Sequence, residues 1–370
     1  MSEIKKLGMP KWGLTMTEGT VVEWLVEEGT ELSNGDQVVE VESEKINNAV
    51  ESSASGVLRR RVANEGDVLP VGGLLGVIAA ADVPDDEIDA FVKEFEENFV
   101  PEEEGESGPA PETVEVGGRQ IQFLKLGDEG STATPLVMIP GYGGDINIFV
   151  FNQETLAADR PVYAVDMPGH GGSTKEVGDG TIDFFVEVVD GFLASQGIEK
   201  AHFAGHSMGG AIASSYALAH PDKVASLILL ASAGYGEEIN SDYIEGFIGA
   251  NKRRDMKSAL QMLFADPDLV TRDLVNDILS YKRKDGVNES LRTVADSVFA
   301  DGKQRVVDAS ELGVPVLAIW GSEDRIVPAS HADNLPKDAK VERIEGKGHM
   351  VQMEAAGPTN RAIGEFLGGF

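Results

Sequence analysis

The sequence predicts two folded domains of different class: an all-β sandwich, and after it an α/β domain with a mainly parallel sheet and a helical lid. A chain of 370 residues is longer than one ordinary core requires. Up to about residue 80, short runs of alternating apolar and polar residues are broken by glycine, which is typical of strands and turns. From residue 114, fully apolar short runs alternate with helix-like stretches, as in a parallel sheet covered on both faces.

Charge and composition exclude several classes of function. The formal charge is −32, with 63 acidic against 31 basic residues, and such a field repels nucleic acid and anionic membranes. An anionic substrate would therefore need a local basic patch. The start of the chain lacks the apolar core of a signal peptide, and no apolar run is long enough to span a bilayer, so we expect a cytoplasmic protein. The chain has no cysteine; we expect no bound metal, and any thiol must come from a prosthetic group or a substrate.

An internal repeat marks residues 1–80 as a sandwich with pseudo-twofold symmetry. Strand-like alternation is clearest at residues 20–26 and 37–41. Five positions recur 37 residues later with the same or a similar residue: Gly19, Val21, Glu28, Gly29 and Gly35 become Gly56, Leu58, Glu65, Gly66 and Gly72. Two similar strand–turn–strand units in succession predict the twofold arrangement.

Lys45 lies between the two halves, among polar residues with a strand on either side, which predicts an exposed hairpin tip. An exposed lysine is most often a plain solvated charge. The surrounding sequence resembles the lipoyl domains of 2-oxo acid dehydrogenase complexes, however, in residues 9–19, in Glu42-Ser43-Glu44-Lys45-Ile46 and in the glycines of the repeat. Biotinyl domains share this fold but usually present Met-Lys-Met at the tip. The resemblance implies that lipoate is attached to Lys45, on a flexible arm that supplies the missing sulfur.

Residues 81–113 read as a short acidic helix and a flexible linker. Pro84 can begin the helix and Pro101 can end it. One face of this helix is apolar, formed by Ile88, Phe91, Val92, Phe95 and Phe99. After Pro101, glutamate, glycine, serine and proline dominate, which indicates an extended chain that repels itself.

Residues 114–370 form the α/β domain. Its apolar strand-like runs lie at residues 135–139, 161–165, 224–231 and 314–320. Residues 236–310 contain no such run and read as helices, with clear stretches at 256–264 and 269–281. Because this segment is inserted between two core strands, we expect it to form a lid.

Ser207 is the candidate nucleophile. It lies in Gly205-His206-Ser207-Met208-Gly209, a G-x-S-x-G motif between a strand-like run at 201–204 and the start of a helix. The glycines permit a tight, strained turn that exposes the serine hydroxyl. The alternative is a glycine-rich helix start without chemistry.

A serine nucleophile needs a base and an orienting acid, and in this arrangement the chain order is serine, acid, histidine. Asp324 follows an apolar strand, at the end where such sites gather, and Glu323 is its rival. His349 lies on a loop after the expected strand at 341–344, and we predict it to be the base. His331 follows Asp324 too closely. The alternative for His349 is a surface histidine with no role in catalysis.

Residues 139–144, Ile-Pro-Gly-Tyr-Gly-Gly, follow another strand and resemble a His-Gly-x-Gly-Gly oxyanion loop, with Pro140 in the histidine position. The backbone N–H groups of Tyr142 and Met208 would then form the oxyanion hole. Residues 166–173 resemble a structural loop of the same superfamily, and we assign them no chemistry.

Residues 114–370 resemble the α/β-hydrolase superfamily, and the whole chain resembles the acyltransferase components of acetoin dehydrogenase complexes. This resemblance implies acetyl transfer from a lipoyl group on Lys45 to coenzyme A. It also implies two partners, a thiamine diphosphate-dependent acetoin dehydrogenase component and a flavin-dependent dihydrolipoyl dehydrogenase. Two alternatives remain open: a serine thioesterase or esterase with an attached lipoyl domain, and a lipoyl carrier whose second domain is a non-catalytic scaffold.

Overall fold

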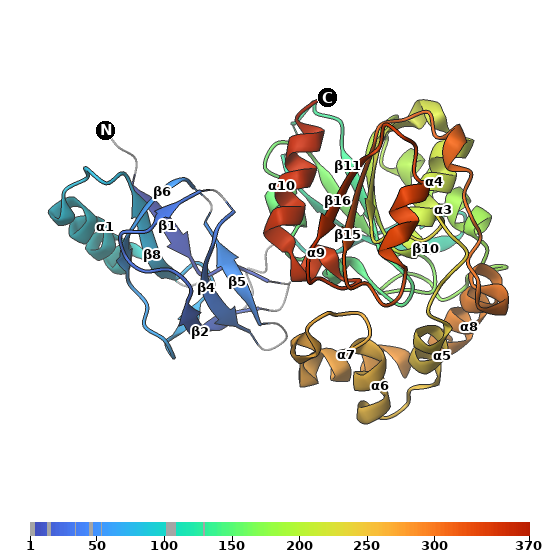
Figure 1. Ribbon diagram of the computed structural model, residues 1–370, viewed down its shortest axis with the longest axis horizontal. Coiled ribbons are helices and arrows are strands. Elements are labelled where there is room, and N and C mark those ends of the chain that lie inside the picture. The colour runs from blue at the N-terminus through green and yellow to red at the C-terminus, as the bar shows by residue number, and fades with distance from the viewer. Residues whose placement is uncertain are drawn as a thin grey trace. The chain divides into compact units, whose positions relative to one another are not determined.

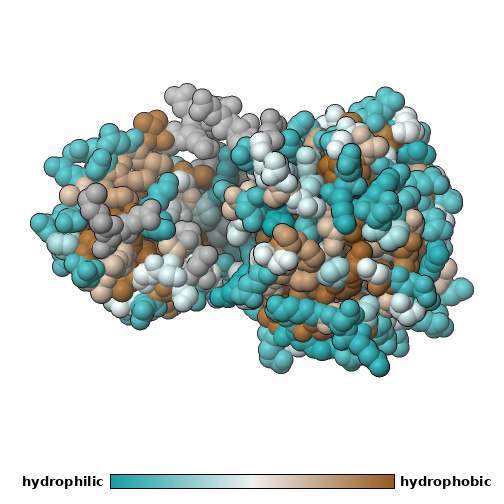
Figure 2. Space-filling view, turned by 90° about the horizontal axis from the view of Figure 1, so that it is seen from above, coloured by the Kyte–Doolittle hydropathy of each residue, from teal (hydrophilic) through white to brown (hydrophobic). Residues whose placement is uncertain are grey.

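The computed structural model describes residues 4–12, 16–33, 35–43, 47–52, 54–100, 109–128 and 130–370. The chain divides into two compact units, Met1–Ala110 and Pro111–Phe370 (Figure 1). The predicted linker residues 101–108 lie outside the described residues. No helix in the described ranges has the length and apolarity that crossing a bilayer requires. Figure 2 shows hydrophilic residues over much of one face of the molecule, as the large negative charge leads one to expect.

The first unit contains two four-stranded sheets, in the orders β1-β8-β6-β3 and β5-β4-β2-β7. All pairings recorded within them are antiparallel. The strands are β1 (Lys5–Gly8), β2 (Glu18–Trp24), β3 (Glu31–Leu32), β4 (Gln37–Glu42), β5 (Asn47–Glu51), β6 (Gly56–Arg61), β7 (Val68–Pro70) and β8 (Leu74–Ala79). Fully buried valine, leucine and isoleucine side chains such as Val39, Leu58 and Leu75 fill the space between the sheets. The predicted all-β fold is therefore confirmed.

The two halves of this unit repeat one another at the level of single hydrogen bonds. Strands β4 and β8 are both six residues long and begin 37 positions apart. Gly29 N–H donates to the carbonyl of Leu58, and Gly66 N–H donates to the carbonyl of Val21, each at 2.8 Å. Both glycines have φ of 89°, a conformation that side-chain-bearing residues rarely adopt. This geometry confirms the predicted pseudo-twofold symmetry.

The acidic helix α1 (Asp85–Asn98) packs on the first sheet. Pro84 precedes its first turn, where a missing N–H costs nothing. Ile88 is fully buried in a small apolar cluster with residues of β8. Phe95 stacks on Phe99 with ring centroids 5.1 Å apart. The predicted apolar face of this helix is thus the face that it buries.

The second unit is built on one eight-stranded sheet, in the order β16-β15-β14-β13-β11-β12-β10-β9. Strand β10 pairs antiparallel with β9 and β12, and the other pairings are parallel. The strands are β9 (Glu112–Val116), β10 (Arg119–Leu126), β11 (Leu136–Ile139), β12 (Val162–Val165), β13 (Ala201–His206), β14 (Val224–Leu230), β15 (Val316–Gly321) and β16 (Lys340–Ile344). The central parallel strands are buried on both faces, which explains their uninterrupted apolar sequences.

Helices cover both faces of this sheet (Figure 1). Helices α3 (Ile182–Ser195) and α4 (Met208–Ala219) contribute to the apolar cluster on one face. Helices α2 (Gln153–Leu156), α9 (Val351–Glu354) and α10 (Ala356–Leu367) contribute to the cluster on the other face. This three-layer arrangement confirms the predicted α/β-hydrolase fold.

Four helices separate β14 from β15 in the chain: α5 (Ser241–Gly249), α6 (Arg253–Leu260), α7 (Arg272–Lys282) and α8 (Val287–Val298). They occupy the segment predicted as a lid, and they differ from the predicted stretches mainly at their ends. Helix α7 begins after Thr271, whose hydroxyl accepts a hydrogen bond from the backbone of Leu274 at 3.2 Å. Apolar spacing reveals the buried face of a helix, whereas such a cap decides where it begins.

Candidate active site

Ser207 occupies the sharp turn between β13 and α4. Its φ of 52° lies in the left-handed region, which costs a residue with a side chain on the order of 1–3 kcal/mol. Backbone hydrogen bonds hold this conformation: Ser207 N–H donates to Leu230, and its carbonyl accepts from Gly210 at 2.9 Å and from Ala233 at 3.0 Å. The serine is thus fixed against the end of the neighbouring strand β14.

The glycines around Ser207 are required by close contacts. A Cβ atom at Gly205 would lie 2.4 Å from the carbonyl oxygen of Gly209. One at Gly209 would lie 2.1 Å from the carbonyl oxygen of Ile139, at the end of β11. The G-x-S-x-G pattern therefore reflects the close approach of α4 to β13 and β11.

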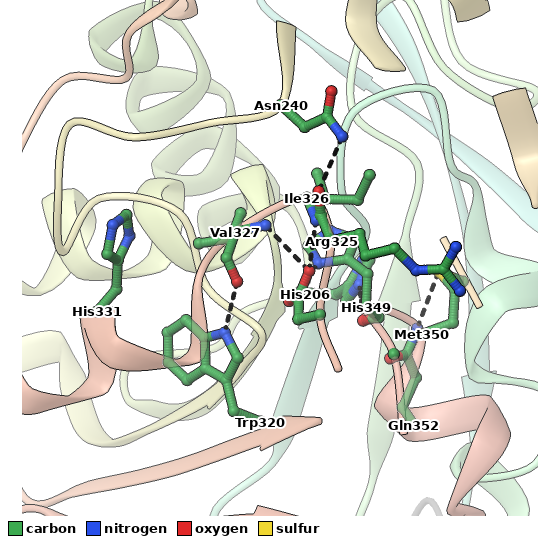
Figure 3. A network of polar contacts seen from close by, with 12 residues as sticks. His206, Asn240, Trp320, Arg325, Ile326, Val327, His331, His349, Met350 and Gln352 are labelled. Carbon is green, nitrogen blue, oxygen red and sulfur yellow. Dashed lines mark hydrogen bonds and ion pairs between the residues drawn. The ribbon is translucent and has the colours of Figure 1, made fainter. Parts of the chain in front are cut away.

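Asp324 and His349 form a buried pair. Nδ1 of His349 lies 2.8 Å from Oδ2 of Asp324, and the two side chains are 2% and 0% exposed. The other carboxylate oxygen accepts backbone hydrogen bonds from Ile326 at 2.8 Å and Val327 at 3.0 Å (Figure 3). The carboxylate thereby holds a proton on Nδ1 and leaves Nε2 as the basic nitrogen. Glu323, the rival acid, is exposed, and it is Asp324 that contacts the histidine.

A buried glutamate that sequence reasoning missed holds the loop of His349. Glu354 accepts a hydrogen bond from Gly348 N–H at 2.9 Å and another from Ala265 N–H at 3.0 Å. His349 N–H in turn donates to the carbonyl of Leu263 at 2.9 Å. Burial raises the pKa of the Glu354 carboxyl. The available signal was one acidic residue within the otherwise uncharged stretch 349–360.

His206, the variable residue before the serine, supports the base. Its ring centroid lies 4.7 Å from that of His349, and its Nε2 is 3.1 Å from the carbonyl oxygen of His349 (Figure 3). Burial holds the pKa of His206 well below its ordinary value, so this ring is neutral at pH 7. A neutral neighbour leaves room for positive charge to develop on His349.

The histidine that was rejected as too close to Asp324 is engaged elsewhere. Nε2 of His331 lies 2.9 Å from a carboxylate oxygen of Glu238, and the side chain is buried. Figure 3 shows His331 well apart from the adjacent His206 and His349.

The loop after β11 lies directly against the nucleophile. A Cβ atom at Gly141 would be 2.9 Å from Cβ of Ser207, and Gly144 N–H closes the turn onto the carbonyl of Gly141 at 3.1 Å. Within the described ranges, no hydrogen bond is recorded from the backbone N–H of Tyr142 or of Met208. Both groups therefore have the free donor that an oxyanion hole requires.

The side chain of Tyr142 contacts helices α5 and α8, which lie in the segment predicted as a lid. Its hydroxyl donates to the carbonyl of Leu291 in α8 at 2.9 Å. Its ring meets that of Phe247 in α5 edge-to-face, with centroids 6.2 Å apart. The two partners are far apart in the sequence, so this connection between the loop after β11 and helices α5 and α8 was not predicted.

The loop at 166–173, to which we assigned no chemistry, has a structural explanation. Asp166 is buried and accepts hydrogen bonds from the backbone of Ile146 and of Gly172, each at 2.8 Å. The amide of Gln122 in β10 donates a third, at 3.0 Å. The carboxylate thus links three segments at one end of the sheet.

Lys45, the predicted lipoyl attachment residue, lies outside the described residues, so only its neighbours are informative. Strands β4 and β5 pair antiparallel up to Glu42 opposite Asn47. The chain on both sides of Lys45 is therefore anchored by strand pairing. A primary amine between two anchored strands fits the amide attachment of a carboxylic acid such as lipoate.

Comparisons with known proteins agree with this two-part construction. Residues 5–78 match the model of a family described as biotin-requiring enzymes, and residues 134–356 match that of the alpha/beta hydrolase fold. Over 99% of both chains, the protein is 48% identical to the dihydrolipoyllysine-residue acetyltransferase component of an acetoin cleaving system from Pseudomonas putida. Its identity to the protein of the same name from Cupriavidus necator is 42%, over 98% of this chain and 96% of the relative.

Among solved structures, a meta-cleavage product hydrolase matches 70% of this chain and 98% of its own, with a TM-score of 0.64 and 24% identity. That likeness bears on the fold of the second unit.

Proposed function

The chain belongs to the family of dihydrolipoyllysine-residue acetyltransferase components of acetoin cleaving systems, and from this premise we propose how its residues transfer the acetyl group. It is an acyltransferase with covalently attached lipoate as cofactor and coenzyme A as co-substrate. In our proposal residues 1–80 carry the acyl group, and residues 81–113 link this domain to the next. Residues 114–370 catalyse the transfer under the lid at 236–310.

Lys45 is the residue that would hold lipoate. When bound, lipoate supplies a dithiol that can carry an acyl group as a thioester. Because the chain itself contains no cysteine, this group and coenzyme A provide the sulfur atoms of the reaction. The paired strands β4 and β5 support the assignment by anchoring the chain on both sides of Lys45.

The first half of the proposed reaction moves the acyl group to Ser207. His349 Nε2 takes the hydroxyl proton while Oγ attacks the carbonyl carbon of the acyl thioester. The N–H groups of Tyr142 and Met208 stabilise the oxyanion. The carbon–sulfur bond then breaks, His349 returns the proton to the departing thiolate, and an acetyl ester remains on Ser207.

The second half passes the acetyl group to coenzyme A. His349 takes the proton of the coenzyme A thiol, and the thiolate attacks the ester carbonyl. The bond between the carbonyl carbon and Oγ breaks, and His349 gives the proton back to Ser207. Asp324 keeps the imidazole oriented and stabilises its charged form throughout both halves.

The observation that carries this proposal is the buried pair of Asp324 and His349, 2.8 Å apart, in a chain that also holds a serine in a strained turn. An inert scaffold would have no need of either feature, since backbone strain and a buried ionisable pair both cost stability. Both features support a catalytic second domain.

Homologue names place the chain in a system with further components. We propose two of them by their chemistry. A thiamine diphosphate-dependent acetoin dehydrogenase component would load the acyl group, and a flavin-dependent dihydrolipoyl dehydrogenase would restore the oxidised ring.

The test supplies S-acetyl-dihydrolipoamide to the purified full chain, with and without coenzyme A, and measures acetyl-coenzyme A against free acetate. We expect acetyl-coenzyme A to be the main product and little acetate to form when the acceptor is present. Release of acetate at the same rate with and without coenzyme A would instead identify a thioesterase.

The carrier role is tested separately by intact-mass analysis of the protein from its native host. We expect the mass of one lipoyl group on the wild-type chain and its absence from Lys45→Arg. The variant should still use free S-acetyl-dihydrolipoamide, because that substrate does not need the attached arm.

A further inference from the structure

The lid carries an unusual share of the positive charge of this acidic protein. Of the 31 basic residues, eight lie within residues 251–286, where six acidic residues accompany them. This segment is therefore slightly positive in a chain whose formal charge is −32. Three of them lie at the start of α6 and three at the end of α7, namely Lys252, Arg253, Arg254, Lys282, Arg283 and Lys284. Lys257 lies in the last turn of α6, and Arg272 begins α7.

A cavity of about 400 Å³ opens beside the end of α7. Its lining includes Asn251, Lys282, Arg283, Lys284 and Glu289. A volume of this size falls in the range of small-molecule sites, which is roughly 300–1,000 Å³. The concave shape and the clustered cations together indicate a small anionic ligand.

The three basic residues of this cavity have different tasks. Nζ of Lys282 donates hydrogen bonds to the carbonyls of Phe247, of Ile248 at 2.9 Å and of Ala250 at 2.8 Å. All of its protons are thus used to fix the end of α5, which forms one wall. Arg283 and Lys284 are exposed and form no ion pair that is recorded in the described part of the chain. Nζ of Lys284 lies 5.9 Å from the ring centroid of Tyr281, a contact that leaves its hydrogen-bond donors available to a ligand.

One aromatic ring lies between Lys282 of this cavity and the loop after β11. Nζ of Lys282 lies 5.5 Å from the ring centroid of Phe247. On its other side, the same ring packs so closely on the loop that a Cβ atom at Gly143 would be 2.6 Å from it. The cavity wall at Lys282 is therefore near the loop beside Ser207, and a ligand held in the cavity by a charged end would need a long flexible arm to reach Ser207.

We propose that this cavity binds the phosphorylated nucleotide end of coenzyme A, with Arg283 and Lys284 facing its phosphates. This inference rests on the proposed function, in which coenzyme A accepts the acetyl group. The cavity also contains Asp285 and Glu289, whose carboxylates can accept hydrogen bonds from the exocyclic amine of adenine. A concave lining with both signs of charge suits a nucleotide better than the acidic face of a protein domain.

The test compares the full-length wild type with the double variant Arg283→Ala/Lys284→Ala. The matched control, Lys200→Ala/Lys337→Ala, removes the same charge from exposed positions outside the lid. Each protein transfers acetyl from S-acetyl-dihydrolipoamide either to coenzyme A or to pantetheine, which lacks the nucleotide and its phosphates.

We expect the lid variant to raise KM for coenzyme A at least about tenfold, since hydrogen bonds to charged groups are each worth roughly that factor. Its kcat and its kinetics with pantetheine should match those of the wild type and of the control. An unchanged KM for coenzyme A in the lid variant would overturn the site while leaving the proposed function intact.

A binding measurement separates failure of the site from failure of the function. Desulfo-coenzyme A, which lacks the thiol, is titrated into each full-length protein by calorimetry. Weaker binding to the lid variant alone supports the site, even if the wild type were found to release only acetate. The inference is also overturned if the variant slows transfer from the attached arm equally for both acceptors, because the slightly positive segment 251–286 would then receive the acidic lipoyl-type unit.

Discussion

The two units of this chain differ in how the fold arranges their predicted functional residues. The first is a repeated structure in which strands, turns and even single hydrogen bonds recur, and its predicted functional residue lies alone between two paired strands. The second is not repeated, and its candidate residues come from separate loops after β11, β13, β15 and β16. All six histidines of the chain belong to this second unit.

This difference shows what each task demands of a fold. A carrier needs one reactive attachment point on a sturdy frame, so a duplicated small sandwich suffices. A catalyst needs an acid, a base, a nucleophile and an oxyanion site within a few ångströms, so it needs strand ends that converge. The experiments below perturb one unit and ask whether the other is affected.

The largest effect should follow Ser207→Ala. Loss of the nucleophile should lower acetyl transfer to coenzyme A by about 10⁶-fold, as loss of the triad serine does in a serine protease. Steady-state kinetics with S-acetyl-dihydrolipoamide measure the effect, and intact mass should show unchanged lipoylation. Ser195→Ala, at the exposed end of α3, is the matched control. Full activity of the Ser207 variant would leave only the carrier and scaffold interpretation.

A smaller but still large loss is expected for Asp324→Asn, about 10⁴-fold in kcat. The amide would donate rather than accept toward Nδ1 of His349, which favours the wrong tautomer. Glu323→Gln is the control because it alters the exposed neighbouring acid. Equal losses in both variants would mean that net charge near the loop, rather than orientation of the imidazole, governs the rate.

The uneven distribution of histidines predicts that acid destabilises the second unit in particular. Burial lowers the pKa of His202 to about 4, so the folded unit binds this proton less readily than the unfolded chain. The stability gained from the neutral ring is complete above the ordinary histidine pKa of about 6.5 and is lost as the pH falls toward about 4. At pH 5 the loss is about 2 kcal/mol.

Removing the ring should remove this loss. We expect the fall in unfolding free energy between pH 7.5 and pH 5 to be about 2 kcal/mol smaller in His202→Gln than in wild type, by urea denaturation. His220→Gln, which alters a half-buried histidine of the same unit, is the control. An identical fall in wild type and in the His202 variant would contradict the prediction.

The smallest effects test the repeat itself. Gly29→Ala and Gly66→Ala place a methyl group at φ of 89°, and no atom lies within 4 Å of the new Cβ in either case. Only backbone strain then remains, and each variant should lose about 1–2 kcal/mol of stability. Thermal unfolding should give equal losses for the pair, with exposed Gly364→Ala in α10 as a control that loses none. Unequal losses would show that the two halves contribute differently to folding.

Much of this architecture was predictable because short sequence patterns determine it. Strand-like patterns predicted the sheets of both units, and the order of serine, acid and histidine after apolar strands predicted the contact between Asp324 and His349. The glycines of the repeat predicted turns because a positive φ favours that residue.

The supporting contacts were not predictable, because they join residues that are distant in the chain. The hydrogen bond from Tyr142 to Leu291 joins residues 149 positions apart, and no sequence pattern near either residue indicates it. The packing of His206 on His349 likewise depends on how two strand ends are placed side by side. Lys282 is likewise buried against three carbonyl oxygens that lie 32–35 residues earlier in the chain.

The bond between Tyr142 and Leu291 has a consequence for how cargo enters. In the proposed mechanism Tyr142 offers its backbone N–H to the reacting carbonyl. Its hydroxyl also donates to the carbonyl of Leu291 in α8, and Phe247 of α5 packs on the adjoining Gly143. An outward movement of α5 and α8 would displace Tyr142, whose backbone N–H is the proposed oxyanion donor. Opening of these helices and completion of the proposed oxyanion site are therefore coupled, and the open form would be inactive. Under the proposed mechanism this coupling would protect the acetyl group from hydrolysis, because the oxyanion site would be incomplete whenever water can enter.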